Sequence, residues 1–350
     1  MCRSRLSSWR RHEWRGLRSP LACLSLIIVL LAPTGSGATA TPGVPAPPRL
    51  PAGLRQPRCP GLLHATPLPF AAVAPRWGTV YEGTLSSPAL HGVTRPYEIY
   101  LPPGYWSFEH AVERYPVLYL LHGAPGVATD WLCRGRAAQT TDALIHSGRI
   151  MPLIIVMPDG NGGFERDTQY VNSWNGRTHA MDYVAHDLVS SIDAHFRTSA
   201  DAAHRAIGGF SEGGYGAMNV GLHHPEEFQT IVSMAGYFVA LRNEVFGAND
   251  PFGHNWDFRH ANSPYDYVDR VPRVHTLRLM IADSTGDDPY TRYAREFSAR
   301  LSGWHIPYTL LLLPPHQGQR GHSWQFWRAT LPTVLRFVDA GWPGAPDRAP

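Results

Sequence analysis

A serine flanked by glycines is the residue of this chain best suited to covalent chemistry. Residues 209–213 read Gly209-Phe210-Ser211-Glu212-Gly213, a G-x-S-x-G pattern. Where a strand precedes this pattern and a helix follows, the serine occupies a tight turn with its hydroxyl exposed for attack on an acyl carbon. A short strand is predicted over residues 206–210, and the small residues 213–217 open a predicted helix. Ser211 is therefore the predicted nucleophile, and the alternative is a purely structural glycine-rich turn.

A serine hydroxyl also needs a base that takes its proton. Where a serine occupies such a turn, the usual chain order is nucleophile, acid, histidine. His322, in Gly321-His322-Ser323-Trp324, follows the last predicted strand and is the expected base. His316 lies on the same loop and is the alternative, whereas His122 is expected to be structural.

The acid that orients the histidine is expected on the loop after the strand predicted at residues 277–282. That loop contains three carboxylates, in Asp283-Ser284-Thr285-Gly286-Asp287-Asp288-Pro289. We favour Asp288, keep Asp287 as the alternative, and rank Asp283 third because it lies too close to the strand.

Two backbone N–H groups must stabilise the oxyanion that forms during acyl transfer. One is expected from Glu212, the residue after the nucleophile. The other is expected from Ala124, in the loop His122-Gly123-Ala124-Pro125-Gly126 that follows the strand predicted at 117–121. The alternative for this loop is an ordinary Gly-Pro turn.

Together these motifs resemble the putative-esterase family of α/β-hydrolases, which includes esterase D, feruloyl and acetylxylan esterases, enterochelin esterases and the antigen 85 mycolyltransferases. The likeness covers roughly residues 76–340. It implies an α/β-hydrolase fold without a large lid, and ester hydrolysis or acyl transfer without a cofactor. It supports Ser211, His322, Ala124 and the carboxylate before Pro289. Glu212 is a departure, because methionine is common there in relatives, and an acidic side chain could alter the pocket.

The elements that must position these residues alternate between strand and helix, which indicates a mainly parallel sheet flanked by helices. The continuous apolar runs 117–121 and 153–157 are typical of strands buried on both faces. The other predicted strands are 80–85, 94–101, 206–210, 230–235, 277–282 and 308–313, and the predicted helices are 183–196, 213–224, 290–301 and 324–338. Regular periodicity lapses between residues 236 and 272, which suggests either a functional loop or a structural insertion.

Composition excludes several other functions. The net charge of +3 comes from the leader, because residues outside 1–18 carry 25 basic and 27 acidic side chains. A near-neutral chain without a basic stripe argues against nucleic-acid binding. No cofactor motif is present. The oxygen-rich residues Asp159, Asn161, Glu165 and Asp167 fail the EF-hand spacing, so no metal site is predicted.

Residues 1–40 resemble a secretory signal peptide. An arginine-rich start, the apolar run 21–32 and the sequence Ala38-Thr39-Ala40 occur in the order that such signals require. We expect an exported protein without a stable membrane partner after cleavage; the alternative is an uncleaved signal anchor. Residues 41–75 then form a Pro-rich extension, residues 76–342 the catalytic domain and residues 343–350 a tail.

Two cysteines remain after removal of the leader, Cys59 and Cys133. In an exported chain they could form one disulfide, or stay as two buried thiols. The function expected from the whole sequence is hydrolysis of a small-molecule or carbohydrate-linked ester. Acyl transfer to a sugar or glycerol hydroxyl is the alternative, and a non-catalytic binding protein on the same scaffold fits the intact motifs less well.

Overall fold

A computed structural model describes residues 53–57, 59, 76–162, 167–241, 250–316 and 320–345. The predicted signal peptide, most of the Pro-rich extension and the end of the tail lie outside these residues. Within the described residues, no helix is both long and apolar enough to cross a membrane.

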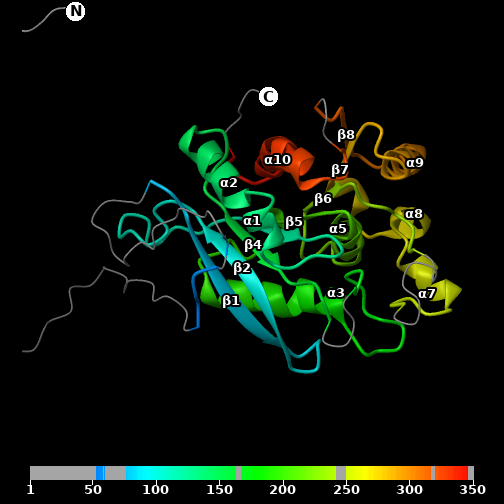
Figure 1. Ribbon diagram of the computed structural model, residues 1–350, viewed down its shortest axis with the longest axis horizontal. Helices are drawn as coiled ribbons and strands as arrows, with labels where there is room; N and C mark the ends of the chain where they lie inside the picture. Colours follow the sequence, from blue (N-terminus) through cyan, green and yellow to red (C-terminus); the bar gives the residue numbers. More distant parts are fainter. Residues whose placement is uncertain are drawn as a thin grey trace, which may run out of the picture. The chain divides into compact units, whose positions relative to one another are not determined.

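The described chain contains one eight-stranded sheet with the order β1-β2-β4-β3-β5-β6-β7-β8 (Figure 1). β2 is antiparallel to both β1 and β4, and all later pairs are parallel. The predicted α/β-hydrolase fold is confirmed in this mainly parallel sheet. The strand bounds are β1 Thr79–Ser87, β2 Val93–Leu101, β3 Val117–Leu121, β4 Ile154–Pro158, β5 Arg205–Phe210, β6 Thr230–Met234, β7 Arg278–Ser284 and β8 Thr309–Leu313.

The two apolar cores on either side of the sheet explain why its central strands are apolar throughout. Side chains of a strand point alternately to opposite faces. In β3, Leu118 and Leu120 join one core, while Tyr119 and Leu121 join the other. A strand covered on both faces therefore has no position where a polar side chain reaches water.

Helices cover each face. On one face lie α1 (Asp130–Cys133), α2 (Ala137–His146) and α10 (Trp324–Asp339), whose buried side chains share the core of Leu118 and Leu120. The other face carries one continuous helical segment and two separate helices. These are α3 (Ala180–Asp182), a π-helix (Tyr183–Leu188) and α4 (Val189–His195), then α5 (Glu212–His223) and α9 (Tyr290–Gly303).

The extension before the domain is attached to it at two described points. Arg55 and Glu82 of β1 exchange backbone hydrogen bonds of 2.8 Å. Cys59 forms a disulfide with Cys133 at the end of α1. Of the two alternatives for these cysteines, the structure therefore has the disulfide.

The aperiodic segment 236–272 is an ordered structure over its described part. It contains α7 (Trp256–Ala261) and α8 (Pro264–Tyr267). Phe252 is fully buried in a small apolar cluster, and Arg259 forms a buried ion pair with Asp250. These contacts favour the structural insertion over the functional loop for the residues described.

A buried carboxyl in β2 makes the stability of the fold depend on pH. Glu98 is 1% exposed, and burial, with the nearby Glu82 carboxylate, raises its pKa to about 8. Between the ordinary pKa of about 4.5 and this value, the folded chain holds a proton that the unfolded chain has released. The free energy of unfolding should therefore fall, by up to about 1.4 kcal/mol per pH unit, as the pH rises through that window.

Urea unfolding at pH 5 and pH 8 tests this dependence. In Glu98→Gln, which does not titrate, the free energy of unfolding should vary less between the two pH values than in the wild type. Glu109→Gln removes an exposed carboxylate and serves as the matched control. Equal pH dependence in the wild type and Glu98→Gln would contradict the prediction.

Candidate active site

Ser211 lies at the corner between β5 and α5, as the G-x-S-x-G pattern predicts. Its backbone has φ 60° and ψ −117°, a left-handed conformation that side chains rarely adopt. Backbone hydrogen bonds of both the N–H and the carbonyl of Ser211 stabilise this conformation. The Ser211 N–H donates to the Met234 carbonyl of β6 at 2.8 Å, and the Ser211 carbonyl accepts from Gly214 at 2.9 Å.

The glycines of the motif permit a close approach of backbone segments. A Cβ at Gly209 would lie 2.2 Å from the carbonyl oxygen of Gly213. A Cβ at Gly213 would lie 2.4 Å from the carbonyl oxygen of His122. Neither position has room for a side chain, so the motif glycines allow the start of α5 to pack against β5 and the end of β3.

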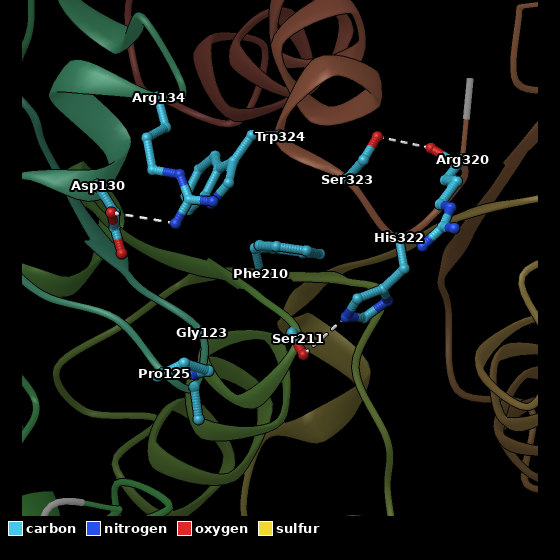
Figure 2. A pocket seen from close by; sticks show the side chains of 11 residues that line it. Gly123, Pro125, Asp130, Arg134, Phe210, Ser211, Arg320, His322, Ser323 and Trp324 are labelled. Carbon is cyan, nitrogen blue, oxygen red and sulfur yellow. Dashed lines mark hydrogen bonds and ion pairs between the residues drawn. The ribbon is translucent and has the colours of Figure 1, made fainter. Parts of the chain in front are cut away.

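A chain of hydrogen bonds joins the serine to a histidine and a carboxylate. His322 Nε2 lies 2.9 Å from Ser211 Oγ, and His322 Nδ1 lies 3.1 Å from Asp287 Oδ2 (Figure 2 shows the first pair). The Asp287 side chain is 12% exposed and the His322 side chain 29%. The three groups therefore have the order that transfers a proton from hydroxyl to imidazole while a carboxylate orients the ring.

The structure brings Asp287, and not the favoured Asp288, into contact with His322. Asp288 is exposed, whereas Asp287 contacts the imidazole. β7 continues to Ser284, beyond the predicted end at residue 282, which moves the turn along the chain. The Asp287 N–H donates to Thr291 Oγ1 at 3.0 Å, and this bond holds the carboxylate at the start of α9.

Asp283, the third candidate acid, belongs to β7 and is 1% exposed. Its Oδ1 accepts a 2.7 Å hydrogen bond from the Ser284 N–H. Burial raises the pKa of Asp283 to about 7. Among the described residues, His322 forms its carboxylate hydrogen bond with Asp287 and none with Asp283.

The histidine loop is positioned by a glycine and a helix cap. A Cβ at Gly321 would lie 2.3 Å from Ser284 Oγ and 3.0 Å from Asp287 Cβ, so this glycine lets the loop reach the carboxylate. Ser323 Oγ accepts from the Phe326 N–H at 3.2 Å and caps α10. His322 is thus held directly before a capped helix.

The other candidate histidines have different positions. His316 is exposed and does not line the pocket around Ser211. His122 is buried, with Nδ1 2.9 Å from the Gly123 carbonyl oxygen, and its Nε2 accepts from the Gly160 N–H at 2.9 Å. Both bonds are made by the tautomer with hydrogen on Nδ1. His122 therefore braces the loop that contains Ala124, as its expected structural role requires.

The predicted oxyanion donors lie on the two segments that border Ser211. Gly123 and Ala124 line the same pocket as Ser211, and a Cβ at Gly123 would lie 3.1 Å from Ser211 Cβ. Glu212 is the first residue of α5, where backbone N–H groups have no partner within the helix. Among the described residues, the N–H groups of Ala124 and Glu212 donate to no backbone carbonyl.

The unusual side chain of Glu212 is buried and is not part of the pocket lining. Its Oε1 accepts from the Gln169 N–H at 3.0 Å, and its carboxyl also bonds to Asp167. Burial and the Asp167 carboxylate raise the pKa of Glu212 well above its usual range. This side chain therefore braces the segment that contains Gln169 and does not line the cavity beside Ser211.

Tyr290 is a site residue that sequence reasoning missed. Its ring stacks on the His322 imidazole with centroids 4.2 Å apart and planes 28° apart, and its hydroxyl hydrogen-bonds to Ser211. Burial raises the pKa of Tyr290. The only sequence signal for a role of Tyr290 in the site was its position at the start of α9, three residues after Asp287.

A cavity of about 440 Å³ opens beside Ser211 and His322 (Figure 2). Phe210 and Trp324 provide aromatic surface, with ring centroids 5.3 Å apart. Asp130 pairs with Arg134 at 3.6 Å, and Arg320 lies on the histidine side of the opening. None of the described residues of segment 236–272 lines this cavity.

Several known proteins that are similar to this chain are named as esterases. A model of the family described as putative esterase matches residues 87–338. A Mycobacterium tuberculosis protein named as an esterase is 29% identical over 225 residues, 55% of this chain and 46% of that protein. An endo-1,4-beta-xylanase/feruloyl esterase of Xylanibacter ruminicola is 37% identical over 132 residues, 37% of this chain and 18% of that protein.

Among solved structures, a ferulic acid esterase superposes with a TM-score of 0.66 and 26% identity, over 76% of this chain and 100% of that one. The chain spans about half, or less, of the length of the curated relatives it matches.

Proposed function

Because the chain belongs to the putative-esterase family, we propose that it is a serine carboxylic-ester hydrolase with Ser211, His322 and Asp287 as its catalytic triad. The observation that carries the proposal is the continuous hydrogen-bond chain from Ser211 Oγ through both imidazole nitrogens to Asp287. A serine with a purely structural role does not require such a chain of hydrogen bonds. Ser211 and His322 also border a cavity that can admit an ester.

In the acylation step, Ser211 Oγ attacks the ester carbonyl carbon while His322 Nε2 takes the hydroxyl proton. Asp287 accepts the Nδ1 hydrogen bond and stabilises the imidazolium cation that forms. The tetrahedral intermediate then collapses, the carbon–alkoxy bond breaks, and His322 gives the proton to the departing alcohol. The product of this step is an ester between the acyl group and Ser211.

In the deacylation step, water attacks the acyl carbon while His322 takes a proton from it. The bond between the acyl carbon and Ser211 Oγ then breaks, His322 gives the proton to Ser211 Oγ, and the carboxylic acid leaves. The backbone N–H groups of Ala124 and Glu212 are proposed to stabilise the oxyanion in both steps. Each such donor typically contributes about 10²–10³-fold to the rate. Neither step needs a cofactor.

The proposed substrate is an aryl or carbohydrate-linked ester. Phe210 and Trp324 offer apolar surface for an acyl or aryl group, while Asp130 and Arg134 offer hydrogen-bonding groups at the same opening. The likeness to a ferulic acid esterase supports an aromatic acyl group.

Export is proposed as well. The sequence of residues 1–40 supports it, and so does the disulfide between Cys59 and Cys133, because disulfides persist mainly in oxidising compartments. Attachment through an uncleaved signal remains the alternative, and N-terminal sequencing of the protein recovered from the medium distinguishes the two.

A panel of esters tests the substrate class. We expect turnover of p-nitrophenyl acetate and butyrate, and higher kcat/KM for methyl ferulate or acetylated xylan than for long-chain esters. Adding glycerol or a sugar and measuring product partition separates hydrolysis from acyl transfer. Predominant formation of the glycerol or sugar ester would favour the acyltransferase alternative, and no turnover of any ester would contradict the proposed function.

A further inference from the structure

Three side chains that commonly bind metal ions gather far from the catalytic triad. Asp182, His186 and His224 each present one ligand atom, and these three atoms all lie within 4.8 Å of one another. His224 caps the C-terminus of α5, whereas Ser211 precedes its N-terminus. A helix of this length spans about 18 Å, so the cluster is separate from the active site.

The helical segment over α3 and the π-helix places two of the ligands on one face. Asp182 ends α3, and His186 lies four residues later in the π-helix, a spacing that brings side chains to the same side. π-Helical turns are rare and occur frequently at functional sites. The apolar side chains Val184 and Leu188 are fully buried, which fixes the opposite face against the core.

His224 is oriented by a neighbouring carboxylate. Its Nδ1 lies 3.1 Å from Glu226 Oε1, and its backbone N–H donates to the Val220 carbonyl. A histidine that donates from Nδ1 to a carboxylate keeps the Nε2 lone pair for a metal, the arrangement found around many metal-binding histidines. The negative end of the α5 dipole adds a favourable field for a cation at this position.

The neighbouring groups are compatible with a cation. The His186 and His224 rings meet edge to face, with centroids 4.7 Å apart, and do not hydrogen-bond to each other. His179 Nδ1 lies 3.5 Å from Asp182 Oδ2 and is the competing partner of that carboxylate. With Glu226, the cluster thus has two carboxylates within reach of its imidazoles.

We propose that Asp182, His186 and His224 bind a divalent transition-metal ion, with zinc as the first candidate. Two imidazole nitrogens and one carboxylate oxygen form a set that zinc accepts, with water in the remaining position. Ligand atoms around a tetrahedral zinc lie about 3.4 Å apart. Rotation of the exposed His186 side chain closes the remaining distance.

A metal here would join the helical segment 180–195 to the C-terminal end of the nucleophile helix. It would stabilise the native state, because a ligand that binds only the folded chain raises the unfolding temperature. It would not take part in the reaction at Ser211. The sequence contains no compact zinc motif because His224 is 38 residues from His186 and reaches it only through the fold.

Zinc titration of the purified full chain, stripped with a chelator and free of a polyhistidine tag, tests the site. Isothermal titration calorimetry should give one strong Zn²⁺ site per chain. His186→Ala and His224→Ala should each weaken it at least tenfold, and Asp182→Asn, which keeps the side-chain size, should weaken it as well. Zn²⁺ should raise the Tm of the wild type and leave that of His224→Ala unchanged.

His204→Ala is the matched control. His204 also pairs with an aspartate at the surface, Asp201 at 2.9 Å, but it is not part of the cluster. Its zinc affinity and zinc-dependent Tm shift should equal those of the wild type. Unchanged zinc affinity in His224→Ala, or no strong zinc binding by the wild type, would overturn the inference. Both readouts are independent of esterase activity.

Discussion

Replacement of Ser211 by alanine is expected to lower kcat for p-nitrophenyl acetate by about 10⁵–10⁶-fold. The substitution removes the atom that bonds to the acyl carbon, and no neighbouring hydroxyl replaces it, because the Tyr290 hydroxyl is a much weaker nucleophile at neutral pH. The proposed oxyanion donors and the cavity remain, so slow residual turnover by bound water should persist. Initial-rate kinetics with the wild type and Ser211→Ala measure the loss.

The variant should remain folded, since alanine fits the space of serine and Ser211 makes its stabilising backbone hydrogen bonds through N–H and carbonyl groups. An unchanged Tm is therefore the control. A fluorophosphonate probe should label the wild type covalently and leave Ser211→Ala unlabelled. Wild-type turnover by a folded Ser211→Ala would remove the basis of the proposed function.

Substitution of Asp287 by asparagine is expected to lower kcat by about 10⁴-fold. The amide donates a hydrogen bond to the imidazole where the carboxylate accepts one, which favours the wrong tautomer and removes the charge that stabilises the imidazolium. The side-chain volume is unchanged, so the contacts of Asp287 with Gly321 and Thr291 can be kept. Steady-state kinetics over several pH values measure the effect.

Asp288→Asn is the matched control, since it removes a carboxylate from the next position of the same turn. Asp288 is exposed and makes no hydrogen bond to the described His322, so kcat should stay within about threefold of the wild type. A larger loss in Asp288→Asn than in Asp287→Asn would reverse the assignment of the acid.

The comparison of these two aspartates illustrates where sequence reasoning stops. Strand β7, the turn after it and the presence of a carboxylate in that turn were predictable from the apolar run 277–282 and from Gly286. The choice between adjacent residues was not, because β7 extends to Ser284 and shifts the turn. Adjacent residues of this turn direct their side chains differently, so the position of the turn decides which carboxylate meets the histidine.

The central strands were predictable because β3 and β4 are buried on both faces and consist of continuous apolar residues. Helix α2 was not predicted, since its buried residues include Thr141 and Asp142. Asp142 accepts hydrogen bonds from the Gly78 N–H at 2.8 Å and the Tyr100 hydroxyl at 2.7 Å. Those partners are distant along the chain, so the polar residue gives no sign of burial before the fold is known.

The left-handed backbone of Ser211 has a consequence for the evolution of the protein. An L-residue in this conformation costs on the order of 1–3 kcal/mol, and glycine would relieve it. Replacement of Ser211 by glycine would therefore raise the free energy of unfolding while removing the hydroxyl that the proposed reaction needs. Selection for thermal stability alone would act against serine at this corner, whereas selection for the proposed ester turnover would retain it.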